Sequence, residues 1–150
     1  MPDLKEQLRA DLTSAMKSRD ELRTATLRMV LAAVSAEEVA GKEARELTDD
    51  EVQAVLRREA KKRREAADAF GAAGRAEQAE RERAEGDVLA GYLPAQLDDA
   101  DLAAIVADVF TRTGASGMKD MGKVMGAAQA AVAGRAEGSR LAAEVRRQLG

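Results

Sequence analysis

The stretch RREAKKRREAADAFGAAGRAEQAERERAEGD, residues 57–87, decides the fold of this chain. Phe70 is its only apolar side chain larger than alanine, and most of the other residues favour helix. Gly71 and Gly74 interrupt the pattern, as residues at the turn between two helices do. The stretch therefore predicts a helical hairpin. Its distal half projects beyond the core and is stabilised mainly by helix propensity and ion pairs.

The residues before this hairpin show apolar side chains at helical spacing in two further segments. The first segment follows Asp3. In the second, about residues 21–39, apolar positions cover more than half of the helix circumference and indicate the most buried helix of the chain. Thr48 and Glu51 match the capping-box pattern that begins the first arm of the hairpin. Together these segments predict a four-helix unit over residues 1–91.

The residues after the hairpin predict a joint and a second domain. The sequence YLPAQL occupies residues 92–97, where Pro94 disfavours helical dihedrals at the residue before it. Three more segments with helical spacing follow within residues 98–150, which we expect to form a three-helix domain. No segment alternates as a strand does. The predicted fold class is therefore all-α: an N-terminal four-helix unit with a projecting hairpin, and a C-terminal three-helix domain.

The composition excludes several kinds of chemistry. The chain has no cysteine and no histidine, which removes thiol catalysis, thiolate metal sites and the commonest general base. It contains no Walker loop and no dinucleotide-binding fingerprint. We therefore expect no catalytic residue, no cofactor and no metal site, and no catalysis by the isolated chain.

Charge and hydropathy restrict the partners. The formal net charge is −3, so binding to a nucleic acid requires a local basic patch. No apolar run approaches the length of a membrane span, and no signal-like leader begins the chain. We therefore expect a cytoplasmic protein with no membrane contact. The sequence leaves the oligomeric state open.

The run RREAKKRR, residues 57–64, concentrates positive charge on the predicted hairpin. Helical spacing places Arg57, Lys61 and Arg64 on one exposed face. This face is either a phosphate track or a solvated surface, and the charge pattern favours the second. In that interpretation the positive charge is balanced by four acids of the returning arm: Glu77, Glu80, Glu82 and Glu85.

Glu59 and Arg63 form a second charged pattern within the same run. They are four residues apart, and both project into the apolar stripe of the predicted helix. Charges on a buried stripe are costly unless they satisfy each other. The two residues therefore form either a structural ion pair, which we favour, or part of a functional cleft.

The stretch MGKVMGAAQAAVAGRAEGSRL, residues 121–141, spaces small residues four apart on the predicted sixth helix: Gly122, Gly126, Ala130 and Gly134. Each glycine inside a helix costs about 1 kcal/mol relative to alanine, so this face needs an explanation. Either a neighbouring helix packs there, most simply the last one, or a sugar-phosphate backbone approaches the main chain. In the second case Lys119 and Lys123 would contact phosphates. Spacing alone favours packing.

The segment KDMGKVMGAAQAAVAGRAEGSRLAAEVRRQL, residues 119–149, resembles the tail-domain motif of the GatB/YqeY family. The segments TLRMVLAAV, LRREAKKRREAADAF and YLPAQL are similar to free-standing YqeY-type proteins, so the resemblance covers essentially the whole chain. Its most specific elements are G-K-V-M at 122–125 and G-R-x-x-G at 134–138. Glu137 departs from the pattern, since the family usually has aspartate at that position.

The resemblance implies a connection with tRNA-dependent amidation. In the amidotransferase B subunit the tail domain contacts tRNA, and the chemistry occurs in a separate catalytic domain that these residues do not contain. The family-level activity, a carbon–nitrogen ligase with glutamine as amido-nitrogen donor, therefore does not describe this chain acting alone.

The resemblance also raises RNA binding at the sixth helix to equal standing with packing, and the two coexist if Gly122 faces inward and Gly126 outward. We expect an accessory protein that binds tRNA by shape and phosphate contacts. The alternative is a protein-interaction module that docks a partner through the hairpin or the small-residue face. The RNA-binding candidates are Lys119, Lys123, Gly126, Arg135 and Arg140.

Overall fold

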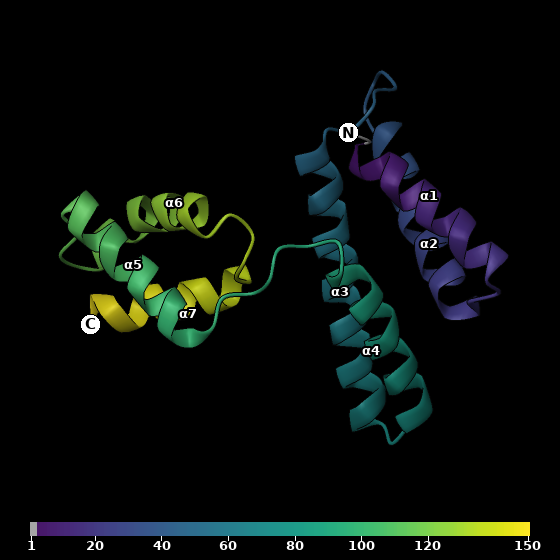
Figure 1. The fold of residues 1–150 in the computed structure, drawn as a ribbon. Coiled ribbons are helices and arrows are strands. Elements are labelled where there is room, and N and C mark those ends of the chain that lie inside the picture. Colours follow the sequence, from purple (N-terminus) through teal and green to yellow (C-terminus); the bar gives the residue numbers. More distant parts are fainter. Residues whose placement is uncertain (1–2) are drawn as a thin grey trace. The chain divides into compact units, whose positions relative to one another are not determined.

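The computed structural model describes residues 3–150, which form helices joined by turns and contain no strand (Figure 1). The chain divides into two compact units, Met1–Leu93 and Pro94–Gly150. The elements of the first unit are α1 (Leu4–Lys17), α2 (Glu21–Glu38), α3 (Asp49–Ala72) and α4 (Ala76–Ala90). Those of the second are α5 (Asp99–Thr113), a short 3-10 helix η1 (Met118–Asp120), α6 (Met121–Val132) and α7 (Gly138–Leu149). The predicted all-α fold class is confirmed.

Side-chain caps determine where four of the helices begin. The carboxylates of Asp20 and Asp98 each accept a hydrogen bond from a backbone N–H in the first turn of α2 and α5. Reciprocal capping boxes begin α1 and α3: Asp3 with Glu6, and Thr48 with Glu51. Each cap satisfies a backbone donor that the helix itself leaves unpaired and contributes about 1 kcal/mol.

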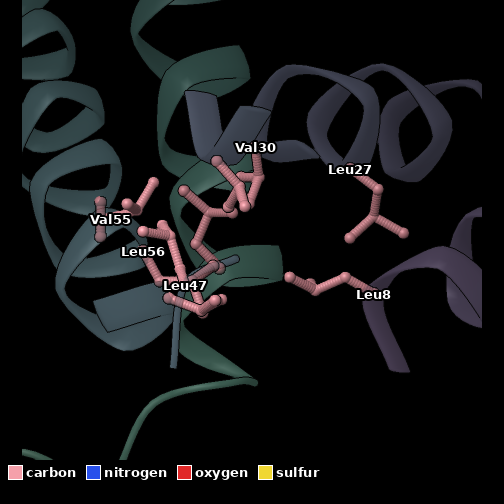
Figure 2. Close-up of a cluster of buried hydrophobic side chains, with 10 residues drawn as sticks. Leu8, Leu27, Val30, Leu47, Val55 and Leu56 are labelled. Carbon is pink, nitrogen blue, oxygen red and sulfur yellow. The ribbon is translucent and has the colours of Figure 1, made fainter. Parts of the chain in front are cut away.

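The core of the first unit lies where α1 and α2 meet the N-terminal half of α3 and the C-terminal end of α4. Figure 2 shows its labelled side chains converging from α1, α2, α3 and, for Leu47, the connection before α3, with Leu8 beside Leu27. Each large aliphatic side chain buried here contributes roughly 1.5–3 kcal/mol. The buried members of this core are Leu8, Leu27, Val30, Val34, Leu47, Val52, Val55, Leu56, Ala60 and Leu89.

The distal half of the α3–α4 hairpin continues beyond this core with small and charged side chains. In the described chain, the buried apolar residues between Ala60 and Leu89 are two alanines, Ala67 and Ala79. Phe70 is only partly buried, and the turn contains Gly74 at φ +76°. The hairpin expected from residues 57–87 is therefore present, and large apolar side chains do not hold its far end together.

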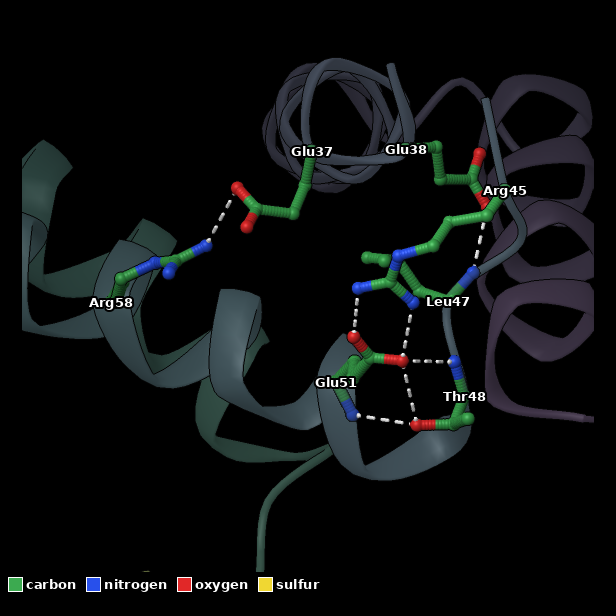
Figure 3. Close-up of polar contacts among 7 residues, drawn as sticks. All are labelled: Glu37, Glu38, Arg45, Leu47, Thr48, Glu51 and Arg58. Carbon is green, nitrogen blue, oxygen red and sulfur yellow. Dashed lines mark hydrogen bonds and ion pairs between the residues drawn. The ribbon is translucent and has the colours of Figure 1, made fainter. Parts of the chain in front are cut away.

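Polar contacts fix the connection between α2 and α3, which has no regular secondary structure of its own (Figure 3). Both carboxylate oxygens of Glu38 lie 2.8 Å from Nζ of Lys5, and one of them also accepts the backbone N–H of Leu47 at 3.2 Å. Arg45 donates to both carboxylate oxygens of Glu51, to one of them at 2.9 Å. The connection is thereby attached to α1, α2 and α3.

The second unit has its own core between α5, α6 and α7. The left-handed residue Gly114, at φ +68°, ends α5 and allows the chain to turn toward α6. None of the helices in residues 3–150 combines the length and apolarity needed to cross a bilayer. The buried members of this core are Leu102, Val106, Val109, Val124, Ala128, Val132, Leu141 and Val145.

Amide hydrogen exchange should be faster at the end of the hairpin than in the core of the first unit. Residues 64–80 have few buried apolar contacts, and we therefore expect them to open by local fluctuations. Their amides should exchange faster than those of residues 22–34 in α2, as measured by mass spectrometry or NMR. Equal protection of the two segments would contradict this expectation.

The stability of the α2–α3 connection should depend on pH. Hydrogen bonds from Arg45, and next from the backbone of Thr48, lower the pKa of Glu51 from 4.5 to about 2. A carboxyl whose pKa is lower in the folded state adds stability that is complete above its unfolded pKa and disappears as the pH falls through the folded one. The variant Glu51→Gln should therefore be less stable than the wild type near neutral pH. The difference should shrink between about pH 5 and pH 2.

Urea unfolding of both proteins at several pH values measures this difference. The matched control is Glu46→Gln in the same connection, because it removes the same charge from an exposed residue. It should give a small difference at every pH. If the loss in Glu51→Gln stayed constant down to about pH 2, the stabilising role of the ionised carboxylate would be excluded.

Candidate functional site

The exposed side of α6 carries the small-residue face, defined here as Gly122, Gly126 and Ala130. Among the described residues, no non-local atom lies within 4 Å of the position that a Cβ would take at either glycine. The expectation that a neighbouring helix packs on this face is therefore wrong, and so is the expectation that Gly122 faces inward. The contacts of α6 with α5 and α7 involve its other side, which buries Val124, Ala128 and Val132.

Two exposed lysines lie near the N-terminal end of this face: Lys119 in η1 and Lys123 in the first turn of α6. Nζ of Lys123 donates to the backbone carbonyl of Thr113 at 3.2 Å, and within residues 3–150 no hydrogen bond or ion pair holds the ammonium of Lys119. The nearby Asp120 accepts a backbone hydrogen bond from Ser116 at 3.0 Å, which is the main cause that lowers its pKa. The charges of both lysines lower that pKa further. The face is thus bordered by two ammonium groups and one ionised carboxylate.

Arg135 closes the C-terminal end of α6. The chain leaves the helix through two left-handed residues, Ala133 at φ +50° and Gly134 at φ +79°. Arg135 Nε donates to the carbonyl of Val132 at 3.0 Å, and Nη2 donates to that of Ala131 at 3.3 Å. These carbonyls belong to the last turn of α6, where the helix itself supplies no N–H group to bond them. The guanidinium of this candidate is therefore engaged within the unit.

Arg140 fastens the segment that leads into α5. Its Nη2 donates to the carbonyl of Leu97 at 2.9 Å and to Oδ1 of Asp99 at 3.0 Å. The backbone N–H of Leu97 in turn donates to the carbonyl of Arg135 at 2.8 Å. Leu97 and Asp99, at the start of α5, are thus joined to the α6–α7 turn by one hydrogen bond and to the first turn of α7 by two. We call this arrangement the turn clamp.

The charge pattern alone did not distinguish the two arginines of the turn clamp from the two exposed lysines. Charge and proximity in sequence placed all four near one ligand. A guanidinium that follows a glycine at a helix end often bonds the last carbonyls of that helix, and G-R at 134–135 carries this signal. Of the five candidates, the structure leaves Lys119, Lys123 and Gly126 on the open side of α6.

Glu59 and Arg63 form an ion pair at 3.3 Å, with side chains only 10% and 15% exposed. Arg63 Nε also lies 3.4 Å from a carboxylate oxygen of Glu85 and 3.7 Å from one of Glu82, both on α4. Nη2 contacts the sulfur of Met29 on α2. This geometry joins α2, α3 and α4 and supports the interpretation as a structural ion pair.

Three exposed cations of the run at 57–64 take partners from α2 and α3, as Figure 3 shows for Arg58 and Glu37. These pairs are Arg58–Glu37 at 3.4 Å, Lys61–Glu65 at 4.0 Å and Lys62–Glu59 at 3.5 Å. In the described chain, no ion pair joins Glu77 or Glu80 to these cations. The expected balance by acids of the returning arm is seen at Arg63, which pairs with Glu82 and Glu85, and not at these three cations.

Tyr92 anchors the C-terminal end of α4, a role that its place in YLPAQL did not indicate. Its hydroxyl donates to a carboxylate oxygen of Asp11 on α1 and accepts from Nη2 of Arg23 on α2 at 3.0 Å. The guanidinium also lies 5.9 Å from the centre of the ring. Burial, followed by the contact with Asp11, raises the pKa of Tyr92 to about 12. The side chain of Tyr92 therefore packs within the first unit.

The turn clamp can be tested by comparing two arginines of α7. Arg140→Ala removes charge-assisted hydrogen bonds to Leu97 and Asp99 and should lower the free energy of unfolding by about 1–2 kcal/mol. Arg146→Ala removes the same charge from an exposed position and should change it by less than about 0.5 kcal/mol. Urea unfolding followed by circular dichroism measures both. Equal losses would show that Arg140 has no special structural role.

Nearly the whole chain matches the model of a known protein family. The family model described as Yqey-like protein matches residues 5–149. The match spans both units, including the α3–α4 hairpin, the small-residue face and the turn clamp. Comparison with curated proteins gives no match. On the family match over almost its whole length, the chain belongs to the YqeY-like family.

Proposed function

We propose that this protein is an accessory factor in tRNA-dependent amidation and that it binds tRNA through the small-residue face of α6. The observation that supports the proposal is the open surface at Gly122 and Gly126. Each glycine costs the helix about 1 kcal/mol relative to alanine, and no close packing inside the described chain compensates for this cost. A ligand that must approach the main chain closely explains both residues.

The recognition mode follows from the groups that border the face. Lys119 lies in η1 and Lys123 in the first turn of α6, four residues apart, and in this proposal both contact phosphates as point charges. The absence of side chains at Gly122 and Gly126 suits the wide, shallow minor groove of an RNA duplex, which proteins recognise by shape and backbone contacts. Arg135 and Arg140 support this surface from inside the unit.

Base stacking has no role in this mode. Tyr92, the single tyrosine of the chain, is held by Asp11 and Arg23, and both phenylalanines are partly buried. Single-stranded RNA binders use exposed aromatic side chains as stacking platforms. The proposed contact is therefore insensitive to base identity.

The proposed role in amidation is to hold tRNA, with glutamine-dependent chemistry supplied by a partner. The alternative is that a protein docks on the same face or on the hairpin. The face is equally open to both kinds of partner. The distal hairpin is the weaker docking site, because the large exposed apolar side chains of the described chain lie elsewhere, at Met16, Val39 and Met118.

Titration of labelled tRNA tests the proposal directly. The variant Lys119→Glu/Lys123→Glu should bind at least about tenfold more weakly than the wild type near 50 mM salt, because phosphate contacts dominate such affinities. The matched control is Arg112→Glu/Arg146→Glu, which makes the same charge change at exposed positions of the same unit. It should bind like the wild type. Equal binding by all three proteins, or no binding by the wild type, would reject the proposal.

A neutral variant separates shape from charge. Gly126→Gln adds a side chain to the small-residue face without changing charge, and the position has no positive φ to strain it. It should raise the free energy of unfolding by up to about 1 kcal/mol and at the same time weaken tRNA binding. The control is Ala104→Gln, at an exposed position of α5. The alternative would be supported if a protein partner bound the wild type after nuclease treatment, did not bind Gly126→Gln, and no tRNA binding was found.

A further inference from the structure

A second positively charged surface lies on α3, outside the site proposed above. We call it the α3 basic row and define it as Arg57, Arg58, Lys61 and Lys62. The side chains of Arg58, Lys61 and Lys62 are 59%, 61% and 65% exposed. Arg57 is partly exposed, and within residues 3–150 it makes no hydrogen bond or ion pair. Helical spacing places Arg57 beside Lys61 and Arg58 beside Lys62.

The acids around this row neutralise it only weakly. Glu37 and Glu65 are 46% and 67% exposed, and they lie 3.4 Å and 4.0 Å from their partners Arg58 and Lys61. Exposed ion pairs of this kind contribute about 0–1 kcal/mol and exchange readily for other partners. The third acid, Glu59, contacts Lys62 but is shared with the mostly buried Arg63 at 3.3 Å. Most of the positive charge therefore remains available to an external anion.

We infer that the α3 basic row binds the phosphate backbone of a nucleic-acid strand. Residues 57–62 span about 7.5 Å along the helix axis. One strand of a duplex presents a phosphate about every 3.4 Å of its axis, so the row faces two or three phosphates. Two arginines and two lysines, with no aromatic side chain among them, contact the backbone independently of base sequence.

The neighbouring surfaces favour a nucleic acid over a membrane and fix the side from which it approaches. The large exposed apolar side chains of the described residues are Met16, Val39 and Met118, none of them on α3, so the row has no anchor for the acyl region of a bilayer. The returning helix α4 is acidic, with five carboxylates against two arginines. A polyanion is therefore repelled from α4 and attracted only to the α3 side of the hairpin.

This inference shares its ligand class with the proposed function but none of its residues, so either can fail alone. The test uses the full chain with labelled tRNA and a labelled single-stranded RNA homopolymer. Arg57→Gln/Lys61→Gln should lower the affinity about tenfold near 50 mM salt. It should also reduce the magnitude of the salt slope by about 2, because two phosphates are no longer neutralised by the protein. The effect should persist in the Lys119→Glu/Lys123→Glu background.

The control is Lys42→Gln/Arg83→Gln, which removes the same charge from exposed residues outside the row. It should leave the affinity and the salt slope unchanged, and circular dichroism should show all variants folded. Glu37→Gln/Glu65→Gln removes two competing carboxylates and should tighten binding several-fold. Three results would each overturn the inference: equal effects of row and control variants, no RNA binding by the wild type, or row-dependent binding to phosphatidylserine vesicles without RNA binding.

Discussion

The ionic contact of Arg63 with carboxylates of α3 and α4 is the interaction on which the first unit depends. The large buried apolar side chains of α3 end at Leu56, and the two helices continue well past that point. Arg63 lies at this boundary, within 3.3–3.7 Å of Glu59, Glu82 and Glu85. A mostly buried ion pair adds little net stability, because desolvation offsets its Coulomb energy, but removal of one partner is costly. The contact therefore selects the register of the hairpin.

The second unit uses arginine in the same structural way. Arg135 and Arg140 satisfy backbone carbonyls where the chain turns, so a short three-helix unit is closed by guanidinium groups as well as by its core. The planar guanidinium has several donors in fixed directions, which lysine does not have. The two arginines are engaged internally, and both lysines of α6 and its approach remain exposed.

Local chemistry explains why some of these features were predictable from the sequence and others were not. Thr48 with Glu51 and the glycines at 71 and 74 act on their immediate neighbours, so the start of α3 and the hairpin followed from short-range rules. The small-residue face of α6 was also predictable, because helical spacing fixes which residues share a face. What covers that face is a tertiary property, and the expected packing of α7 was wrong. The partners of Arg58, Lys61 and Lys62, which lie on α2 and α3 rather than on α4, were mispredicted for the same reason.

Two open surfaces on a chain of net charge −3 have a consequence for any polyanion they contact. At physiological salt, charges are screened beyond about 8 Å, so only the local potential of each surface attracts phosphates, and Asp120 or Glu37 lowers it. Phosphate binding at either surface, as proposed above, should therefore weaken steeply as the salt concentration rises.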